Sequence, residues 1–132
     1  MNPITPVEAF GNFPTEQKRL IDFIKRAKIS GVVFISGDRH FAELIKRKEE
    51  GLYPLYDFTS SPLTSGPAMP KAAEADNPSR IKGTLVTGKR NFGMLQVTGT
   101  AKERTLLMKC FDTAGIELWR HEIKLSELTF SS

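Results

Sequence analysis

The chain has 132 residues, 39% of them hydrophobic and 26% charged, which is typical of one folded domain and excludes a disordered tail or two folded units joined by a linker. Its single cysteine excludes an internal disulfide and a zinc site of paired thiolates, and neither a bilayer-length apolar run nor a signal peptide is present, which leaves the compartment open. The net charge of +4 comes from scattered lysines and arginines without a basic stripe interleaved with aromatics, so we expect no nucleic-acid partner.

The first predicted element is an amphipathic helix at residues 15–28, TEQKRLIDFIKRAK. The apolar side chains that recur at helical spacing are Leu20, Phe23, Ile24 and Ala27. We expect this face to pack on a sheet, with Thr15 as the N-cap and Gly31 as the stop signal beyond the helix.

A buried strand is predicted at residues 32–35, where VVFI is apolar at every position. Such a strand is normally covered on both faces, as in a parallel sheet with helices outside, and a helix followed by it is half of an α/β unit. Residues 41–48, FAELIKRK, fit a short helix and an edge strand equally well. Residues 53–61, YPLYDFTSS, have strand composition. Because of Pro54, we expect this strand either to lie at the edge of its sheet or to begin at Pro54.

A long loop is predicted at residues 62–80, which hold four of the eight prolines. A loop of this length inside a compact domain is either functional or mobile. After it the hydrophobic period changes to two, and short strands are expected at 84–87, 92–98, 105–111 and 118–125. The segment DTAG at 112–115 has hairpin turn chemistry, so the last third is predicted to be an antiparallel meander.

Residue types that bind metals follow the predicted buried strand. Gly37 allows a sharp turn, and ligands of open α/β sheets lie at the carboxyl ends of strands. Asp38 and His40, separated by Arg39, offer a hard oxygen and an imidazole nitrogen, which suit iron, manganese, zinc or calcium. From the residues alone the structural alternative is favoured, in which Asp38 turns the chain and His40 is a half-buried histidine, because a catalytic metal site needs about three protein ligands.

The stretch VVFISGDRHFAEL resembles the C-terminal metal-binding motif of PhoD-like phosphatases, a branch of the calcineurin-like metallophosphoesterases. The resemblance continues in order through YDFTSSPLTSG, RNFGMLQV and TLLMKCFDTAGIELWRHEIKLSEL, and reaches back into NFPTEQKRLIDFI, so it covers the chain from about Phe10. It implies an α/β (α+β) fold: a partial two-sheet sandwich with one packed helix and a buried parallel strand, followed by a mostly antiparallel sheet. It also implies metal-dependent hydrolysis of phosphate esters, in a family whose members are often exported.

The resemblance also assigns roles to four residues. The wider superfamily carries Gly-His-x-His here, with both histidines on a dinuclear metal centre; His40 matches the second histidine, and Asp38 stands in the place of the first, as in the PhoD-like variant. Arg39 fills the variable position and Asn91 lies toward the substrate side, so both are candidates for binding the substrate phosphate. The default roles are a surface ion pair for Arg39 and turn formation for Asn91.

The family's other metal motifs, which are aspartates and an Asn-His pair, belong to an upstream region that these 132 residues do not contain. A two-metal hydrolase needs both ions, one to activate water and both to hold the phosphate. We therefore expect the chain to supply part of a site, as a truncation or a short gene, to be inactive alone, and to expose an apolar surface that favours a homodimer. The alternative is a noncatalytic β-rich interaction module that uses the loop at 62–80.

Two other reactive side chains are assigned structural roles. Cys110 lies mid-strand among apolar neighbours, where a raised thiol pKa makes it inert. His121 alternates with Trp119 and Ile123 on the apolar face of a strand, which predicts a hydrogen-bonded core histidine. No G-x-S-x-G motif is present, so no nucleophilic triad is expected.

Overall fold

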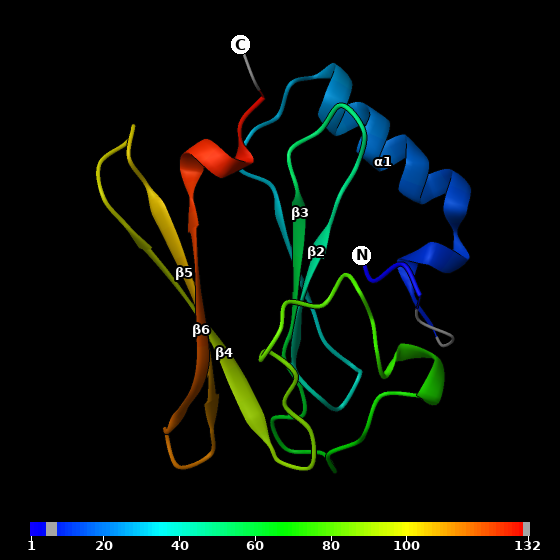
Figure 1. The fold of residues 1–132 in the computed structure, drawn as a ribbon, viewed down its shortest axis with the longest axis vertical. Coiled ribbons are helices and arrows are strands. Elements are labelled where there is room, and N and C mark those ends of the chain that lie inside the picture. Colours follow the sequence, from blue (N-terminus) through cyan, green and yellow to red (C-terminus); the bar gives the residue numbers. More distant parts are fainter. Residues whose placement is uncertain (5–7, 131–132) are drawn as a thin grey trace.

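The computed structural model describes residues 1–4 and 8–130. One α-helix and two three-stranded sheets lie in three layers, with the helix on the outer face of the first sheet and the second sheet on its inner face (Figure 1). The fold is therefore a mixed α+β fold. Among the described residues, no helix combines the length and the apolar character needed to cross a bilayer.

The first sheet has the strand order β1-β3-β2 and contains β1 (Val33–Ser36), β2 (Glu43–Arg47) and β3 (Leu55–Thr59). The predicted parallel strand is confirmed, because β1 pairs with β3 in parallel, whereas β2 runs antiparallel to β3. The expected cover on both faces of β1 is wrong: the side chain of Ile35 is 67% exposed. The physical reason is that β1 is an edge strand. Ile35 lines an open hollow of about 300 Å³ together with Phe58 and Leu95, at the edge of the space between the two sheets, so the second sheet does not cover it.

The second sheet is the predicted antiparallel meander, with β4 (Asn91–Thr98), β5 (Thr105–Asp112) and β6 (Glu117–Lys124). The Oδ1 atom of Asp112 accepts hydrogen bonds from two backbone N–H groups of the β5–β6 turn, both at 3.0 Å. The strand expected at 84–87 is wrong. Only an isolated bridge between Val86 and Ala42, the residue before β2, forms there, because Gly83 and Gly88, both with positive φ, turn the chain on either side of it.

Helix α1 (Pro14–Arg26) differs from its prediction at both ends. It begins at Pro14, so Thr15 is inside the helix rather than its cap, and the left-handed residue after its end is Lys28, with φ of 52°, ahead of Gly31. The buried face also differs: it is formed by Ile21 and Ile24, whereas Phe23 and Ala27 are exposed. One helix on a three-stranded sheet buries a narrow stripe, and the predicted face was rotated away from that stripe.

The core lies between the two sheets. The rings of Phe58 on β3 and Trp119 on β6 have centroids 4.9 Å apart, and the buried Met108 and Cys110 of β5 belong to the same cluster. Gly93 on β4 permits this packing, because a Cβ atom there would lie 2.8 Å from the Phe58 ring. The ring of Phe58 thus joins the two sheets, because it packs on Trp119 of β6 and lies close to the backbone of β4 at Gly93.

Candidate metal-ligand loop

The loop Gly37–His40 leaves the carboxyl end of β1 in a constrained conformation. Asp38 has a φ of 66° and His40 a φ of 60°, so two non-glycine residues are left-handed with Arg39 between them. Left-handed conformation costs an L-residue roughly 1–2 kcal/mol. The sharp turn expected at Gly37 is therefore made by its neighbours, and Gly37 itself has no positive φ.

The imidazole of His40 is oriented by the long loop. Its Nδ1 lies 2.7 Å from the carbonyl oxygen of Gly66, and because a carbonyl only accepts, the N–H is on Nδ1. The backbone N–H of His40 donates to Ser61 Oγ at 2.8 Å, and its carbonyl accepts from the N–H of Ala68 at 2.7 Å. In the neutral ring, Nε2 consequently carries the lone pair, which is the arrangement found in metal-binding histidines.

The carboxylate of Asp38 is exposed and has no hydrogen bond or ion pair to any of the described residues. It borders a hollow of about 360 Å³ together with Phe41, Met69 and Lys71. His40 is not among the residues that line this hollow. The turn therefore presents both donors outward from the end of β1 but does not direct them into one shared cavity.

The guanidinium of Arg39 points into the protein. Its Nη2 donates to both carboxylate oxygens of Glu74, at 2.8 and 2.6 Å, and the two side chains are 13% and 0% exposed. The guanidinium also lies over the ring of Phe41, 4.9 Å from its centroid. The default ion pair of Arg39 is thus present, but it is buried rather than on the surface, and it occupies the group that was a candidate for the substrate phosphate.

Glu74 belongs to a buried polar network that anchors the long loop. The Nδ2 atom of Asn2 donates to Glu74 at 3.2 Å and to Glu43 at 3.1 Å, and Arg80 Nε donates to Glu43 at 2.8 Å. Asn77 donates to Asn2 at 2.9 Å. Residues 62–80 contain one short 3-10 turn and otherwise no helix or strand, as predicted, yet their second half is fixed by this network. Sequence reasoning missed it because charged loop residues carry no signal of burial.

Another buried carboxylate, Asp57 in the centre of β3, is also satisfied within the protein. It accepts a hydrogen bond from Ser36 Oγ at 2.8 Å and contacts the α-amino group of Met1. Its oxygens are consequently engaged and do not add a third donor beside His40.

Asn91 is buried, and its amide joins the end of β3 to the start of β4. Its Oδ1 accepts from Ser60 Oγ at 3.1 Å, and its Nδ2 donates to the carbonyl of Ser61 at 2.8 Å. Its backbone N–H donates to Pro62 at 3.0 Å. The amide proposed for substrate binding is thus used in holding the Ser61 segment, which in turn bonds to His40.

Of the two structural assignments from sequence, that of Cys110 is confirmed, whereas His121 is half-buried rather than a hydrogen-bonded core residue. Cys110 is fully buried, and burial raises the pKa of its thiol to about 12, which keeps it protonated. Burial first, and then the charge of Lys46, lower the pKa of His121. The ring of His121 packs on Tyr56 at 5.7 Å, and within the described part of the chain it makes this contact in place of the hydrogen bond that was expected.

The loop after β1 therefore offers two metal-ligand types, an oriented imidazole and an exposed carboxylate. Within residues 1–4 and 8–130, no group of three or more His, Cys, Asp or Glu side chains comes together to hold a metal ion. Comparison with protein-family models, with curated proteins and with solved structures returned no match to this chain.

Proposed function

We propose that this chain is part of a metal-dependent phosphoric ester hydrolase of the PhoD-like type, a phosphatase or phosphodiesterase, in which His40 and Asp38 provide ligands to a dinuclear site. The observation that carries the proposal is the hydrogen bond from His40 Nδ1 to the Gly66 carbonyl, which leaves Nε2 for a metal. The left-handed backbone at both donors adds support, because strained non-glycine residues cluster at functional sites.

The residues present fit part of such a site. An imidazole and a carboxylate suit iron, manganese or zinc, and the carboxylate also suits calcium. The remaining donors of a dinuclear centre have to come from outside the described residues, since no larger donor group forms among them. When bound, the metal pair would activate a water and neutralise the phosphate. The residues of this chain orient the metal ligands: the Gly66 carbonyl fixes the imidazole of His40, and the Arg39–Glu74 pair fixes the turn that carries Asp38 and His40. Alone, the chain is inactive.

Paramagnetic broadening by Mn²⁺ tests the ligand role without requiring activity. In a ¹⁵N-labelled chain, added Mn²⁺ should broaden the amides of residues 38–40 and 66–68 first. His40→Ala should abolish the effect, whereas the matched variant His121→Ala, which removes the other histidine, should retain it. Broadening that is absent, or that survives in His40→Ala, would contradict the proposal.

Hydrolysis assays test the prediction that the chain is inactive alone. With p-nitrophenyl phosphate or bis-p-nitrophenyl phosphate and added iron, manganese, zinc or calcium, we expect rates at background. Turnover that is lost in His40→Ala and kept in His121→Ala would show that the chain carries a sufficient site by itself. If the chain is inactive alone, as we expect, co-expression with a polypeptide that carries the aspartate and Asn-His motifs should raise activity above background.

The second candidate function is a noncatalytic interaction module that uses the loop at 62–80. It is favoured by two apolar side chains of this loop, Leu63 and Met69, which are 65% and 67% exposed. This function predicts that metal ions leave the amides of residues 38–40 unperturbed, so the Mn²⁺ titration separates the two.

A further inference from the structure

Helix α1 carries a second apolar stripe that the first sheet does not cover. Ile21 and Ile24 are buried against the sheet, whereas Phe23 is 49% exposed and Leu20 is half-buried. Phe13, just before the helix, is 64% exposed. An amphipathic helix normally has one apolar face, and a second face of this kind marks a contact surface.

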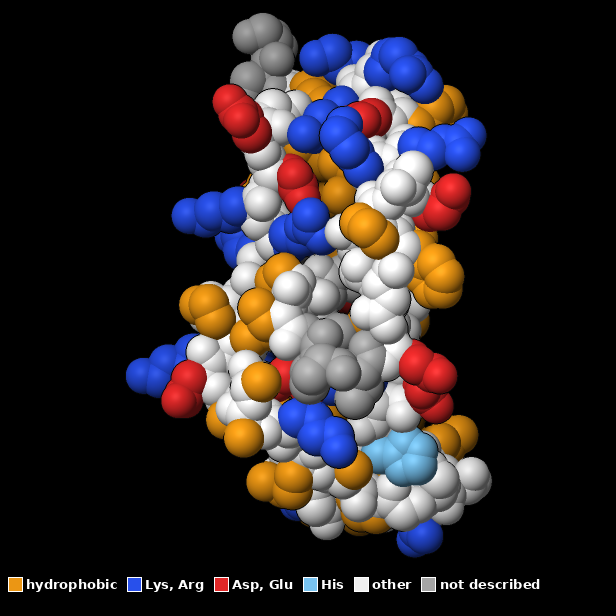
Figure 2. All heavy atoms as spheres, turned by 90° about the vertical axis from the view of Figure 1, so that its right-hand side faces the viewer, with side chains coloured by type: hydrophobic (Ala, Val, Ile, Leu, Met, Phe, Trp, Pro, Cys, Tyr) orange, Lys and Arg blue, Asp and Glu red, His pale blue; other side chains and the backbone are white. Residues whose placement is uncertain are grey.

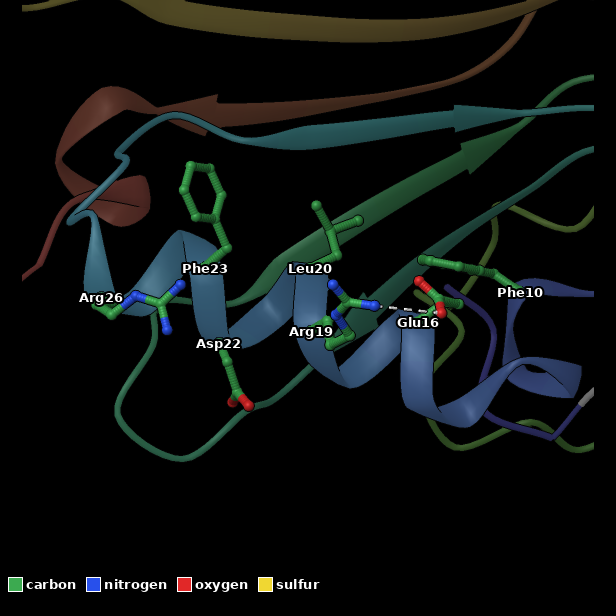
Figure 3. Close-up of a pocket in the computed structure, with 7 residues that line it drawn as sticks. All are labelled: Phe10, Glu16, Arg19, Leu20, Asp22, Phe23 and Arg26. Carbon is green, nitrogen blue, oxygen red and sulfur yellow. Dashed lines mark ion pairs between the residues drawn. The ribbon is translucent and has the colours of Figure 1, made fainter.

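A groove of about 630 Å³ runs along this stripe. Its apolar lining comes from Leu20 and Phe23, whose side chains point to the same side of α1, and from Phe10 in the preceding segment (Figure 3). The charged residues that line it are Glu16, Arg19, Asp22 and Arg26. On this side of the molecule, Lys and Arg side chains are interspersed with acidic and exposed hydrophobic ones (Figure 2).

The four charges of the groove form a self-complementary pattern. Along α1 the signs alternate: Glu16 is negative, Arg19 positive, Asp22 negative and Arg26 positive. Read in the reverse direction, the series therefore has the opposite sign at each position. If a second α1 runs antiparallel about a two-fold axis near Ile21, Glu16 meets Arg26 of the other copy, and Arg19 meets Asp22. Each contact occurs twice. A parallel helix would place like charges together.

Within one chain these charges form only solvent-exposed pairs among the described residues. Arg19 lies 3.6 Å from Glu16 and Lys18 lies 2.5 Å from Asp22, and these pairs are exposed. The Lys18 hydrogen bond and charge lower the pKa of Asp22, so that carboxylate is ionised at neutral pH. Exposed pairs of this kind contribute little, which leaves the groups free to re-pair across an interface.

We infer that this groove binds α1 of a second copy of the chain, giving an antiparallel, two-fold homodimer. A two-fold interface uses one patch twice and therefore requires a surface that complements itself, as this one does. The first and last of the four charges, Glu16 and Arg26, are ten positions apart, which is about 15 Å of helix. A contact of this length is short for a standard interface, which buries roughly 800 Å² per partner, so we expect a weak dimer.

Sedimentation equilibrium from about 5 to 500 μM chain tests the interface through a charge swap. Arg26→Glu and Glu16→Arg should each weaken dimerisation at least about tenfold, because each sets like charges opposite one another. The double variant Glu16→Arg/Arg26→Glu should restore it, since the swapped pattern is again self-complementary. Lys82→Glu, an exposed site outside the groove, makes the same charge change as Arg26→Glu and should have no effect.

Three results would overturn the inference. The first is a chain that stays monomeric at every concentration. The second is a dimer that Arg26→Glu leaves unchanged or that the charge swap does not rescue. The third is a dimer that Leu95→Lys, at an exposed position of β4 outside the groove, abolishes while Arg26→Glu does not. All variants alter exposed side chains, and far-UV circular dichroism checks that each is folded.

Discussion

The buried ion pair between Arg39 and Glu74 makes the sharpest stability prediction. Arg39→Met keeps most of the side-chain volume and an apolar group beside the ring of Phe41, but it removes both hydrogen bonds to Glu74. The carboxylate of Glu74 would then be fully buried, and among the described residues Asn2 would be its remaining side-chain donor. A buried charge left without its counter-ion is the main cost of such a change.

The expected loss follows from burial. Removing one partner of a buried pair costs about 3–5 kcal/mol, and the residual exposure of Arg39 places this case near about 3 kcal/mol. That is a large part of the roughly 5–15 kcal/mol that stabilises a typical domain. It corresponds to a fall in Tm of roughly 10 °C.

Urea denaturation measures this loss, with the fluorescence of Trp119, the single tryptophan, as the signal. The matched control is Arg120→Met, which breaks an exposed pair with Glu117 and should barely move the midpoint. Arg39→Met/Glu74→Met, which removes both charges, should recover at least half of the loss. The reasoning is refuted if Arg39→Met and Arg120→Met unfold at the same urea concentration, or if the double variant is no more stable than Arg39→Met.

Three further outcomes are expected. Gly93→Ala should destabilise the protein by about 1–3 kcal/mol, because the new methyl group overlaps the Phe58 ring. The control Gly66→Ala has open space around the new methyl group and should not destabilise the protein. Equal Tm values of the two variants in thermal denaturation would contradict this prediction. Since burial holds the pKa of His121 below its ordinary 6.5, the unfolded chain takes up its proton first, and the stability from this group is full above about pH 6.5 and falls below it. The urea midpoint of His121→Gln should therefore fall less between pH 8 and pH 5 than that of the unsubstituted chain. An equal fall in the two proteins would contradict this prediction. Finally, Cys110 should resist Ellman's reagent at pH 8 until urea unfolds the chain, and rapid labelling of the native protein would show that the thiol is accessible.

The sequence predicted elements whose signal is local. The alternating pattern of residues 92–98, 105–111 and 118–125 gave strands within a residue or two of β4, β5 and β6, and the Asp112 turn was specified by its own side chain. Residues 41–48 could not be decided from pattern. They form β2 because β3 is available to pair with them.

The errors arose where tertiary context decides. Residues 20, 21, 23 and 24 are all apolar, so helical spacing allows two adjacent faces, and only contact with the sheet selects Ile21 and Ile24. The apolar run that forms β1 reads as buried on both faces, but cover depends on what lies beyond that edge. In the candidate site, His40 and Asp38 were found by residue type. Glu74 was not, because its contact to Arg39 spans 35 positions.

The backbone at Asp38 and His40 has a consequence for laboratory evolution. Glycine adopts a positive φ without the steric cost borne by any other residue, so replacement by glycine at either position relieves the turn. Selection of a mutant library for heat resistance should accordingly enrich glycine at these two positions, while selection for retention on an immobilised cation should deplete it. Opposite enrichment at the same two codons would separate residues kept for chemistry from residues kept for folding.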